Sequence, residues 1–277
     1  MHQEPGRIGA TPDGAINPCA RLEEAIKAGD LQLAFEPLMS LQQQPATPRY
    51  RVSVRVTSTA ADSLRDESGF ATVISANGTL RMAALRAVVK PSLLVRIDLW
   101  TLGKSLQALA RHQAVSKDWH LFVPQAMSSV RLKQWLTWTQ DRLAGLKLRG
   151  ENLTLFIDNA DLLSSLATAS TAFPAMTKLG IGICITDFNA QPASQSLLRD
   201  YRIDSLVPRP ELVSDKTQRD ILTQIIRQAH AQQTSVIAGG VSDAETLSRA
   251  WDLGADLITG PFLQSPTSAM NFDFDAT

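Results

Sequence analysis

Short apolar or alternating runs recur along the chain, and most of them are followed by a segment with helical spacing. We expect strands at 31–36, 50–56, 119–123, 152–157, 181–186, 203–207, 234–238 and 256–259. Strands that alternate with helices build α/β domains, and eight such units close into a barrel. The chain has 277 residues, a length that one large barrel reaches as a single domain. The pattern therefore predicts a TIM-like (β/α)8 barrel.

Helical spacing is clearest in the second half of the chain. The segment 216–232 places Ile221 and Ala229 on one apolar stripe, as a core-facing helix does. A later helix, near 243–253, opens on Ser242 and Glu245, which have the spacing of a capping box. Both patterns predict helices that pack on the outside of the barrel.

Three segments divide the chain. Residues 1–17 are rich in Gly and Pro without periodicity, so we expect a disordered leader, followed by one barrel domain over 18–277. Gly69, Asn77-Gly78 and Pro91 interrupt the segment 57–96, which we expect to be a loop-rich excursion after the second strand.

Composition excludes several classes of protein. Lys plus Arg and Asp plus Glu number 27 each, so the formal net charge is zero and we expect no DNA- or RNA-binding surface. Two cysteines, Cys19 and Cys184, are too few for a disulfide framework, and Cys184 lies in an apolar run that predicts a buried thiol. No apolar run approaches the ~20 residues that span a bilayer. We therefore expect no membrane insertion and a cytoplasmic location.

Glycines stand at the carboxyl ends of the last two expected strands, where barrels of this class build their sites. Gly239 and Gly240 follow one strand, and Gly260 follows the other. Glycine lets the backbone approach a ligand, and a helix N-terminus favours an anion. The pattern indicates a phosphate cradle or, equally, two tight turns.

Charged side chains mark two further strands. Arg51, Ser53 and Arg55 share one face of the strand 50–56 and alternate with valines. Guanidinium groups suit phosphate recognition, although Arg51 has an alternative role in an internal salt bridge to Asp187 or Glu36. Asp187 itself follows an apolar strand, as either a site residue or a cap of the next turn.

Several short motifs carry a family resemblance. The first strand ends in Glu36-Pro37-Leu38, and a helix starts with Ile97-Asp98-Leu99-Trp100. Asp187-Phe188, Ile237-Ala238-Gly239-Gly240-Val241 and Thr259-Gly260 follow. In order and spacing, from about residue 20 to the end, these motifs resemble the EAL domain of cyclic-di-GMP phosphodiesterases. The ending, from Phe262 to Phe274, most resembles the C-terminal EAL domain of FimX-type regulators of type IV pili.

The resemblance implies a barrel of the EAL type that has lost its metal ligands. Active members hold two divalent metals with carboxylates and an Asn, and a Lys helps to position the water. These metals need hard oxygen ligands. Of the family's ligand positions only Asp187 is retained, and the others hold Arg51, Pro124, Phe156, Asn159, Thr186, Val207, Arg209 and Gly239. We therefore expect no catalytic residue, no metal or other cofactor, and no phosphodiesterase activity.

Binding without catalysis is what the resemblance then implies. Arg55 resembles a ligand-phosphate contact of the family, and Arg51 and Arg209 stand where metal ligands stood. The negative charge of Glu36 opposes them, since the family usually has Gln there. The candidate cyclic-di-GMP-binding residues are Glu36, Pro37, Leu38, Arg51, Arg55, Asp98, Asp187, Phe188, Arg209, Gly239, Gly240 and Gly260.

We therefore predict a catalytically inactive regulatory protein, a cyclic-di-GMP receptor and/or a protein-binding scaffold in bacterial second-messenger signalling. The resemblance implies control of type IV pili, motility or biofilm formation through a protein partner, an adaptor or regulator. The segments 57–96 and 262–277 are the expected partner surfaces, unless the tail packs on its own barrel. One alternative is a scaffold that binds no nucleotide. The other is a barrel enzyme that acts on a small phosphorylated metabolite through the glycine loops.

Overall fold

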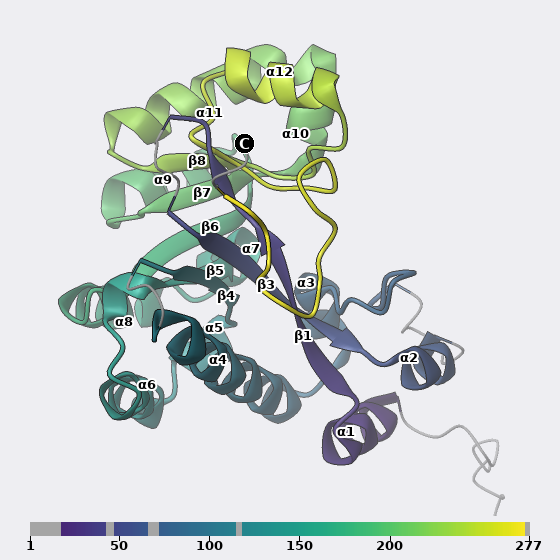
Figure 1. Cartoon of the computed structure of the whole chain (residues 1–277). Coiled ribbons are helices and arrows are strands. Elements are labelled where there is room, and N and C mark those ends of the chain that lie inside the picture. Colours follow the sequence, from purple (N-terminus) through teal and green to yellow (C-terminus); the bar gives the residue numbers. More distant parts are fainter. Residues whose placement is uncertain (1–17, 43–46, 66–71, 115–117, 275–277) are drawn as a thin grey trace, which may run out of the picture.

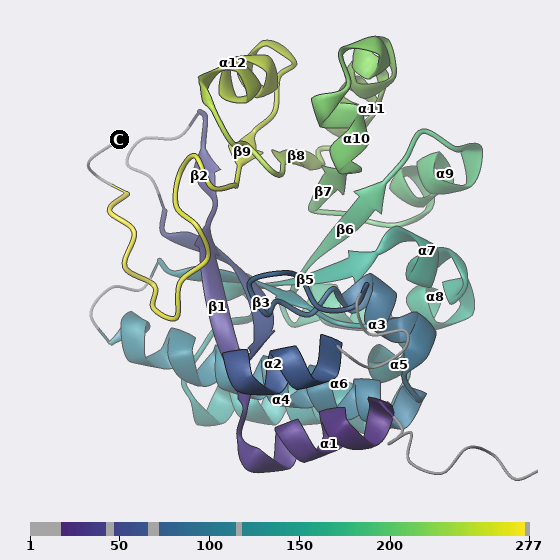
Figure 2. The same cartoon turned by 90° about the vertical axis from the view of Figure 1, so that its right-hand side faces the viewer.

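The strands of the computed structural model form one barrel-shaped sheet (Figures 1 and 2). The structure describes residues 18–42, 47–65, 72–114 and 118–274, so the expected leader lies outside the described residues. Within them, nine strands pair in the order β1-β3-β4-β5-β6-β7-β8-β9-β2. They are β1 (Leu31–Pro37), β2 (Met39–Ser40), β3 (Arg49–Val56), β4 (His120–Pro124), β5 (Leu153–Asp158), β6 (Gly182–Phe188), β7 (Ser205–Pro208), β8 (Ser235–Ala238) and β9 (Leu257–Ile258). The eight expected strands are confirmed, and β2 is additional.

The first strand gives the barrel an unusual closure. β1 is antiparallel to β3, whereas β3 through β9 are parallel. After Leu38 the same segment continues as β2, which pairs with the far edge of the sheet at β9. Parallel pairing requires a long crossover, usually a helix, and the short connection from β1 to β3 provides none. One strand of the expected (β/α)8 pattern is therefore reversed.

Helices cover the outside of the sheet (Figure 2). They are α1 (Pro18–Ala28), α2 (Ser58–Arg65), α3 (Met82–Val88), α4 (Pro91–Gln113), α5 (Met127–Val130), α6 (Lys133–Gly145), α7 (Asn159–Leu163), α8 (Leu166–Lys178), α9 (Pro192–Asp200), α10 (Pro210–Ser214), α11 (Arg219–Ala231) and α12 (Ala244–Asp252). Two 3-10 turns, η1 (Gly150–Asn152) and η2 (Lys216–Gln218), complete them. Among the described residues, no helix is both long and apolar enough to cross a bilayer.

The described parts of the excursion 57–96 contain more helix than the loop-rich segment that the sequence predicts. It contains α2, α3 and the start of α4. Ala, Met, Leu and Arg favour α3, and Pro91 occupies the first turn of α4, where its missing N–H costs nothing. Gly78 does make a tight turn: its φ is +81°, and a Cβ there would lie 2.7 Å from the Val56 carbonyl oxygen.

The expected helices at the end of the chain form with small corrections. In α11, Leu222, Ile225, Ile226 and Ala229 are buried, whereas Ile221 is 37% exposed. The capping box of α12 lies one residue later than predicted. Asp243 is the N-cap, and its carboxylate accepts from the Thr246 amide at 2.8 Å. The Ser242 hydroxyl donates to that carboxylate at 2.8 Å. Glu245 is therefore left to pair with Arg249 at 3.1 Å.

Apolar side chains fill the barrel interior. Leu38, Phe122, Phe156, Cys184, Ile237 and Leu257 form this cluster. The predicted burial of Cys184 is confirmed, and it raises the pKa of the thiol to about 12. The thiols of Cys19 and Cys184 are both free of disulfides.

The C-terminal stretch packs on its own barrel, as one of the two predicted alternatives has it (Figure 1). The backbone of Thr267 bonds to both the N–H and the C=O of Phe35, at 2.7 and 2.9 Å. The amide of Phe272 donates to the Tyr50 hydroxyl at 2.9 Å, and the ring of Phe274 meets Tyr50 edge-on at 5.4 Å. The tail thus covers the outer face of β1 and β3.

Candidate ligand-binding site

A cavity of about 540 Å³ opens at the carboxyl ends of the parallel strands. Strands β3 to β6 and the loops after β7 and β8 form its floor and sides, and α3 forms one wall. Its apolar lining includes Leu80, Met82, Leu94, Phe156 and Val207. Pockets that combine an apolar lining with a few polar groups are typical small-molecule sites.

Arg51 brings a cation to this cavity, because its side chain points to the inner side of β3. The guanidinium lies 3.7 Å from the Glu36 carboxylate and 5.8 Å above the ring centre of Phe156. The internal ion pair considered from the sequence therefore exists, with Glu36 as the partner. The Arg51 side chain is still 45% exposed, so it also faces the cavity.

Glu36 is the acidic member of this ion pair and does not itself line the cavity. Burial raises the pKa of its carboxyl group, and Arg51 opposes that effect in part. A raised pKa lowers the negative charge that Glu36 brings to the site.

Arg55 lies on the same inner side of β3, two positions beyond Ser53. Its Nε donates to the Thr79 hydroxyl at 3.3 Å. Thr79 and Ser53 line the cavity, whereas Arg55 stands behind Thr79. The alternation predicted for this strand is confirmed, since Val52, Val54 and Val56 are buried on the outer face.

Two carboxylates meet on the opposite side of the cavity. Asp187 is the penultimate residue of β6 and has φ at +53°, a left-handed conformation that Asp tolerates better than most residues. Burial raises its pKa, and the neighbouring carboxyl of Asp158 raises it further by repulsion and by a hydrogen bond. Arg209 and Arg51 partly oppose the rise. A raised pKa lowers the negative charge that Asp187 brings to the cavity.

Arg86 and Asp161 complete this side, and the sequence analysis missed them together with Asp158. Arg86 reaches from α3 and lies 2.5 Å from Asp161 and 3.4 Å from Asp158. The three-residue spacing of Asp158 and Asp161 is an N-cap signal that the sequence contains. No local pattern points to Arg86, because its role depends on a helix that the sequence analysis did not predict.

The glycine loops differ from each other. Gly239 and Gly240 line the cavity, and Gly240 has φ at +76°. Gly260 does not line it, and it packs against Val241 so closely that a Cβ would lie 2.3 Å from the Val241 carbonyl oxygen. Its glycine requirement is therefore explained by backbone packing.

Other candidate residues lie outside the cavity lining. Asp98 is fully buried behind it, where its carboxylate accepts from the Ala126 amide at 2.9 Å and from the Ser129 hydroxyl at 2.5 Å. Burial raises the Asp98 pKa to about 7. Phe188, Leu38 and Pro37 are buried, and Arg209 is exposed at the start of α10. These residues shape or flank the cavity.

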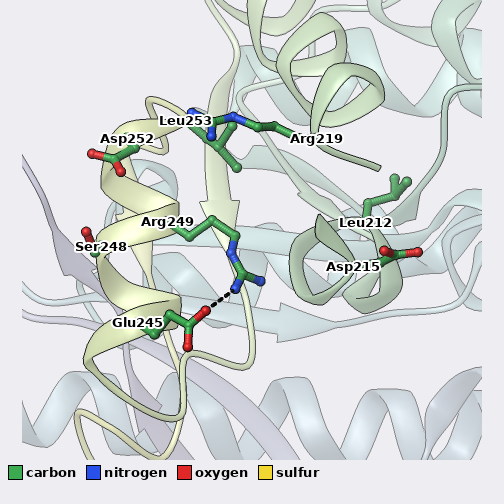
Figure 3. Close-up of a pocket in the computed structure, with 8 residues that line it drawn as sticks. All are labelled: Leu212, Asp215, Arg219, Glu245, Ser248, Arg249, Asp252 and Leu253. Atoms are coloured by element: carbon green, nitrogen blue, oxygen red, sulfur yellow. Dashed lines mark hydrogen bonds and ion pairs between the residues drawn. The ribbon is translucent and has the colours of Figure 1, made fainter. Parts of the chain in front are cut away.

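Two smaller cavities lie elsewhere. One, of about 370 Å³, lies among α10, α11 and α12, where Arg249 and Glu245 form an ion pair (Figure 3). The other, of about 380 Å³, lies at the amino ends of the strands. There His120 bonds to Thr154 at 2.8 Å, and burial lowers its pKa to about 4.

Comparison with known structures supports the fold. The chain is 25% identical to the FimX EAL domain, with a TM-score of 0.79 over 92% of this chain and 98% of that one. It is also 25% identical to the FimX EAL domain from Pseudomonas aeruginosa bound to c-di-GMP, with a TM-score of 0.77 over 94% of this chain and 100% of that one.

Curated relatives are longer proteins. An uncharacterized 76.5 kDa protein from Thiocystis violacea is 26% identical over 243 residues, which are 87% of this chain and 32% of that protein. The signaling protein YkoW from Bacillus subtilis (strain 168) is 22% identical, over 91% of this chain and 30% of its own length. The chain thus spans about a third of these relatives. The family model for the EAL domain matches residues 20–266, and the chain therefore belongs to the EAL domain family.

Proposed function

We propose that this EAL domain binds cyclic-di-GMP in the cavity at the carboxyl ends of its strands and does not hydrolyse it. The observation that carries the proposal is the charge of the lining. Three guanidinium groups, those of Arg51, Arg81 and Arg86, line the cavity together with two carboxylates, Asp158 and Asp187, and burial raises the pKa of Asp187. Such a lining suits a ligand with two phosphates and two apolar ring faces.

The residues do not fit a pair of divalent metals. Hard cations require several free oxygen ligands at short range. Asp158 is engaged by Arg86 and by the α7 cap, and Arg51 stands at the position of the family's motif glutamate. Within the described part of the chain, no group of three or more His, Cys, Asp and Glu has a geometry suited to a metal. We therefore do not propose hydrolysis by the family mechanism.

The two other functions have weaker support. An enzyme that uses both glycine loops as a phosphate cradle would need Gly260 at the cavity, and Gly260 packs on Val241 instead. A scaffold that binds no nucleotide does not explain why the cavity keeps an open, arginine-rich lining. The solved FimX EAL domain from Pseudomonas aeruginosa, which matches the whole fold, holds c-di-GMP.

Regulation through a protein partner completes the proposal. A domain that binds without catalysis acts through its surface, and the resemblance implies an adaptor or regulator of type IV pili, motility or biofilm formation. The excursion with α2 and α3 is the preferred partner surface, because α3 forms a wall of the cavity and connects it to the outside. The proposal places this activity in the cytoplasm.

Calorimetry with cyclic-di-GMP tests the proposal. The titration is run once with a chelator and once with Mg²⁺, and the products are analysed by chromatography. We expect one binding event with the same affinity in both buffers and no linear dinucleotide. Loss of binding in chelator, or product that forms with Mg²⁺, contradicts the proposal.

A further inference from the structure

The wall that α3 forms along the cavity is attached to the barrel by an ion cluster. Arg86 leaves α3 and contacts two carboxylates of the β5–α7 segment, with 2.5 Å to Asp161 and 3.4 Å to Asp158. The three side chains are between 12% and 17% exposed. Ion pairs that are this far removed from water are stronger than pairs on the surface.

Each of the two carboxylates also accepts a hydrogen bond from a backbone amide. Asp158 accepts from the Asp161 amide at 3.0 Å and caps α7. Asp161 accepts from the amide of Met127, the first residue of α5, at 2.8 Å. Arg86 therefore connects α3 to the starts of two other helices, which surround the same end of the barrel.

Apolar contacts of α3 with the core are made by the buried Leu85 and the partly buried Met82 and Ala84. The helix has seven residues, and Leu85 is its buried side chain. Its N-cap, Arg81, makes no side-chain cap hydrogen bond. Four consecutive residues, Arg81 to Ala84, line the cavity together with Arg86. The position of this wall thus depends strongly on the ion cluster.

Charge adds a second reason for the arginine. Asp158 bonds to Asp187, and Asp161 and Arg86 both act on the buried carboxyl of Asp98. Without Arg86, this group of acids would lack its central cation beside a cavity that must accept phosphate. The guanidinium group of Arg86 stabilises these carboxylates by its positive charge, as a bound cation does in other proteins.

We propose that Arg86 is a positioning residue, which holds α3 as the cavity wall by serving as the built-in counter-ion of Asp158 and Asp161. The inference rests on the proposed function for its ligand and adds the residue on which the shape of the site depends. Arg86 acts through α3 and the acids, so the proposal requires no contact between Arg86 and the nucleotide.

Hydrogen exchange and calorimetry on three variants test this role. The variants are Arg86→Gln, Arg86→Lys and, as the matched control, Arg81→Gln, which changes an arginine of the same wall outside the ion cluster. In Arg86→Gln we expect the amides of 82–88 to exchange at least about tenfold faster and cyclic-di-GMP affinity to fall about tenfold or more. Arg86→Lys keeps the charge and should restore most of the slow exchange.

The two readouts separate this inference from the proposed function. If the parent protein does not bind cyclic-di-GMP, the proposed function fails, while faster exchange in Arg86→Gln still supports the positioning role. Unchanged exchange of 82–88 in Arg86→Gln overturns the inference, whatever the binding result. Exchange that is equally fast in Arg81→Gln also overturns it, because any change in the wall would then loosen the helix.

Discussion

Asp98 provides the sharpest test of the electrostatics around the site. Its carboxyl is fully buried, and burial raises its pKa from 3.8 to about 7. A folded state that holds this proton more tightly than the unfolded chain loses stability as the pH rises from the unfolded to the folded pKa. The contribution is therefore complete below pH 3.8 and is lost by about pH 7.

Asp98→Asn removes this dependence. At about 1.4 kcal/mol per pH unit, the ionised carboxylate costs the fold about 4 kcal/mol above pH 7, and about 3 kcal/mol of that develops between pH 5 and 8. The amide oxygen of Asn can replace the oxygen that accepts from Ala126 and Ser129. We expect the free energy of unfolding of Asp98→Asn, minus that of the parent, to rise by about 3 kcal/mol from pH 5 to 8.

Urea unfolding at several pH values between 5 and 8 measures this difference. The lowered pKa of His120, about 4, acts in the opposite direction in the parent but cancels in the difference because both proteins carry it. Ser105→Ala is the control, since it removes a buried uncharged hydroxyl from the same helix, and its effect should not vary with pH. A difference for Asp98→Asn that is constant over this range refutes the reasoning.

The remaining predictions concern the ligand and the tail. Arg51→Ala should weaken cyclic-di-GMP binding about tenfold or more, because Arg51 lines the cavity and a guanidinium–phosphate contact contributes about 1.5–3 kcal/mol. Calorimetry measures it, Arg227→Ala on the outside of α11 is the control, and equal affinity contradicts the assignment. No linear dinucleotide should form with Mg²⁺ or Mn²⁺; product whose rate depends on Asp187 would show that catalysis survives. Truncation after Pro266 should lower the free energy of unfolding by at least about 3 kcal/mol, because Met270 and Phe274 are 4% and 7% exposed. An unchanged melting curve would rule out this structural role of the tail.

The sequence was sufficient for the strands because each one carries a local signal. Period-two alternation in 50–56 and short apolar runs elsewhere mark residues that face the core. The reversal of β1 is not a local property, since antiparallel pairing depends on the length of the connection to β3 and on the pairing of the following strand, β2, with β9. The excursion 57–96 contains a helix that its breaker residues do not predict, because the helix propensity of Met82–Val88 is sufficient between them.

The candidate site could be predicted only where its residues lie on strands or directly after them. Arg51 lies in β3, Asp187 lies near the end of β6, and Gly239 and Gly240 follow β8. All four line the cavity. The polar residue Asp98, by contrast, belongs to a motif whose structural role is to hold the β4–α5 turn through the Ala126 amide. A family motif therefore does not show which of its residues contact a ligand and which only support the residues that do. Arg86 required the tertiary structure, because its two partners lie more than seventy positions away along the chain.

The charges around the cavity bear on both the stability of the barrel and the ligand that its lining suits. A buried carboxylate is costly unless it is neutralised or has a cationic neighbour. In this chain each acidic side chain near the cavity has a basic neighbour. Glu36 lies beside Arg51, Asp158 and Asp161 share Arg86, and Arg209 and Arg51 act on Asp187. The same guanidinium groups leave the lining suited to phosphate, so compensation within the fold and recognition of an anion follow from one set of residues. Substitution of one of these paired arginines should therefore affect both stability and binding. Substitution of Arg81, which lines the cavity outside these pairs, should affect binding alone.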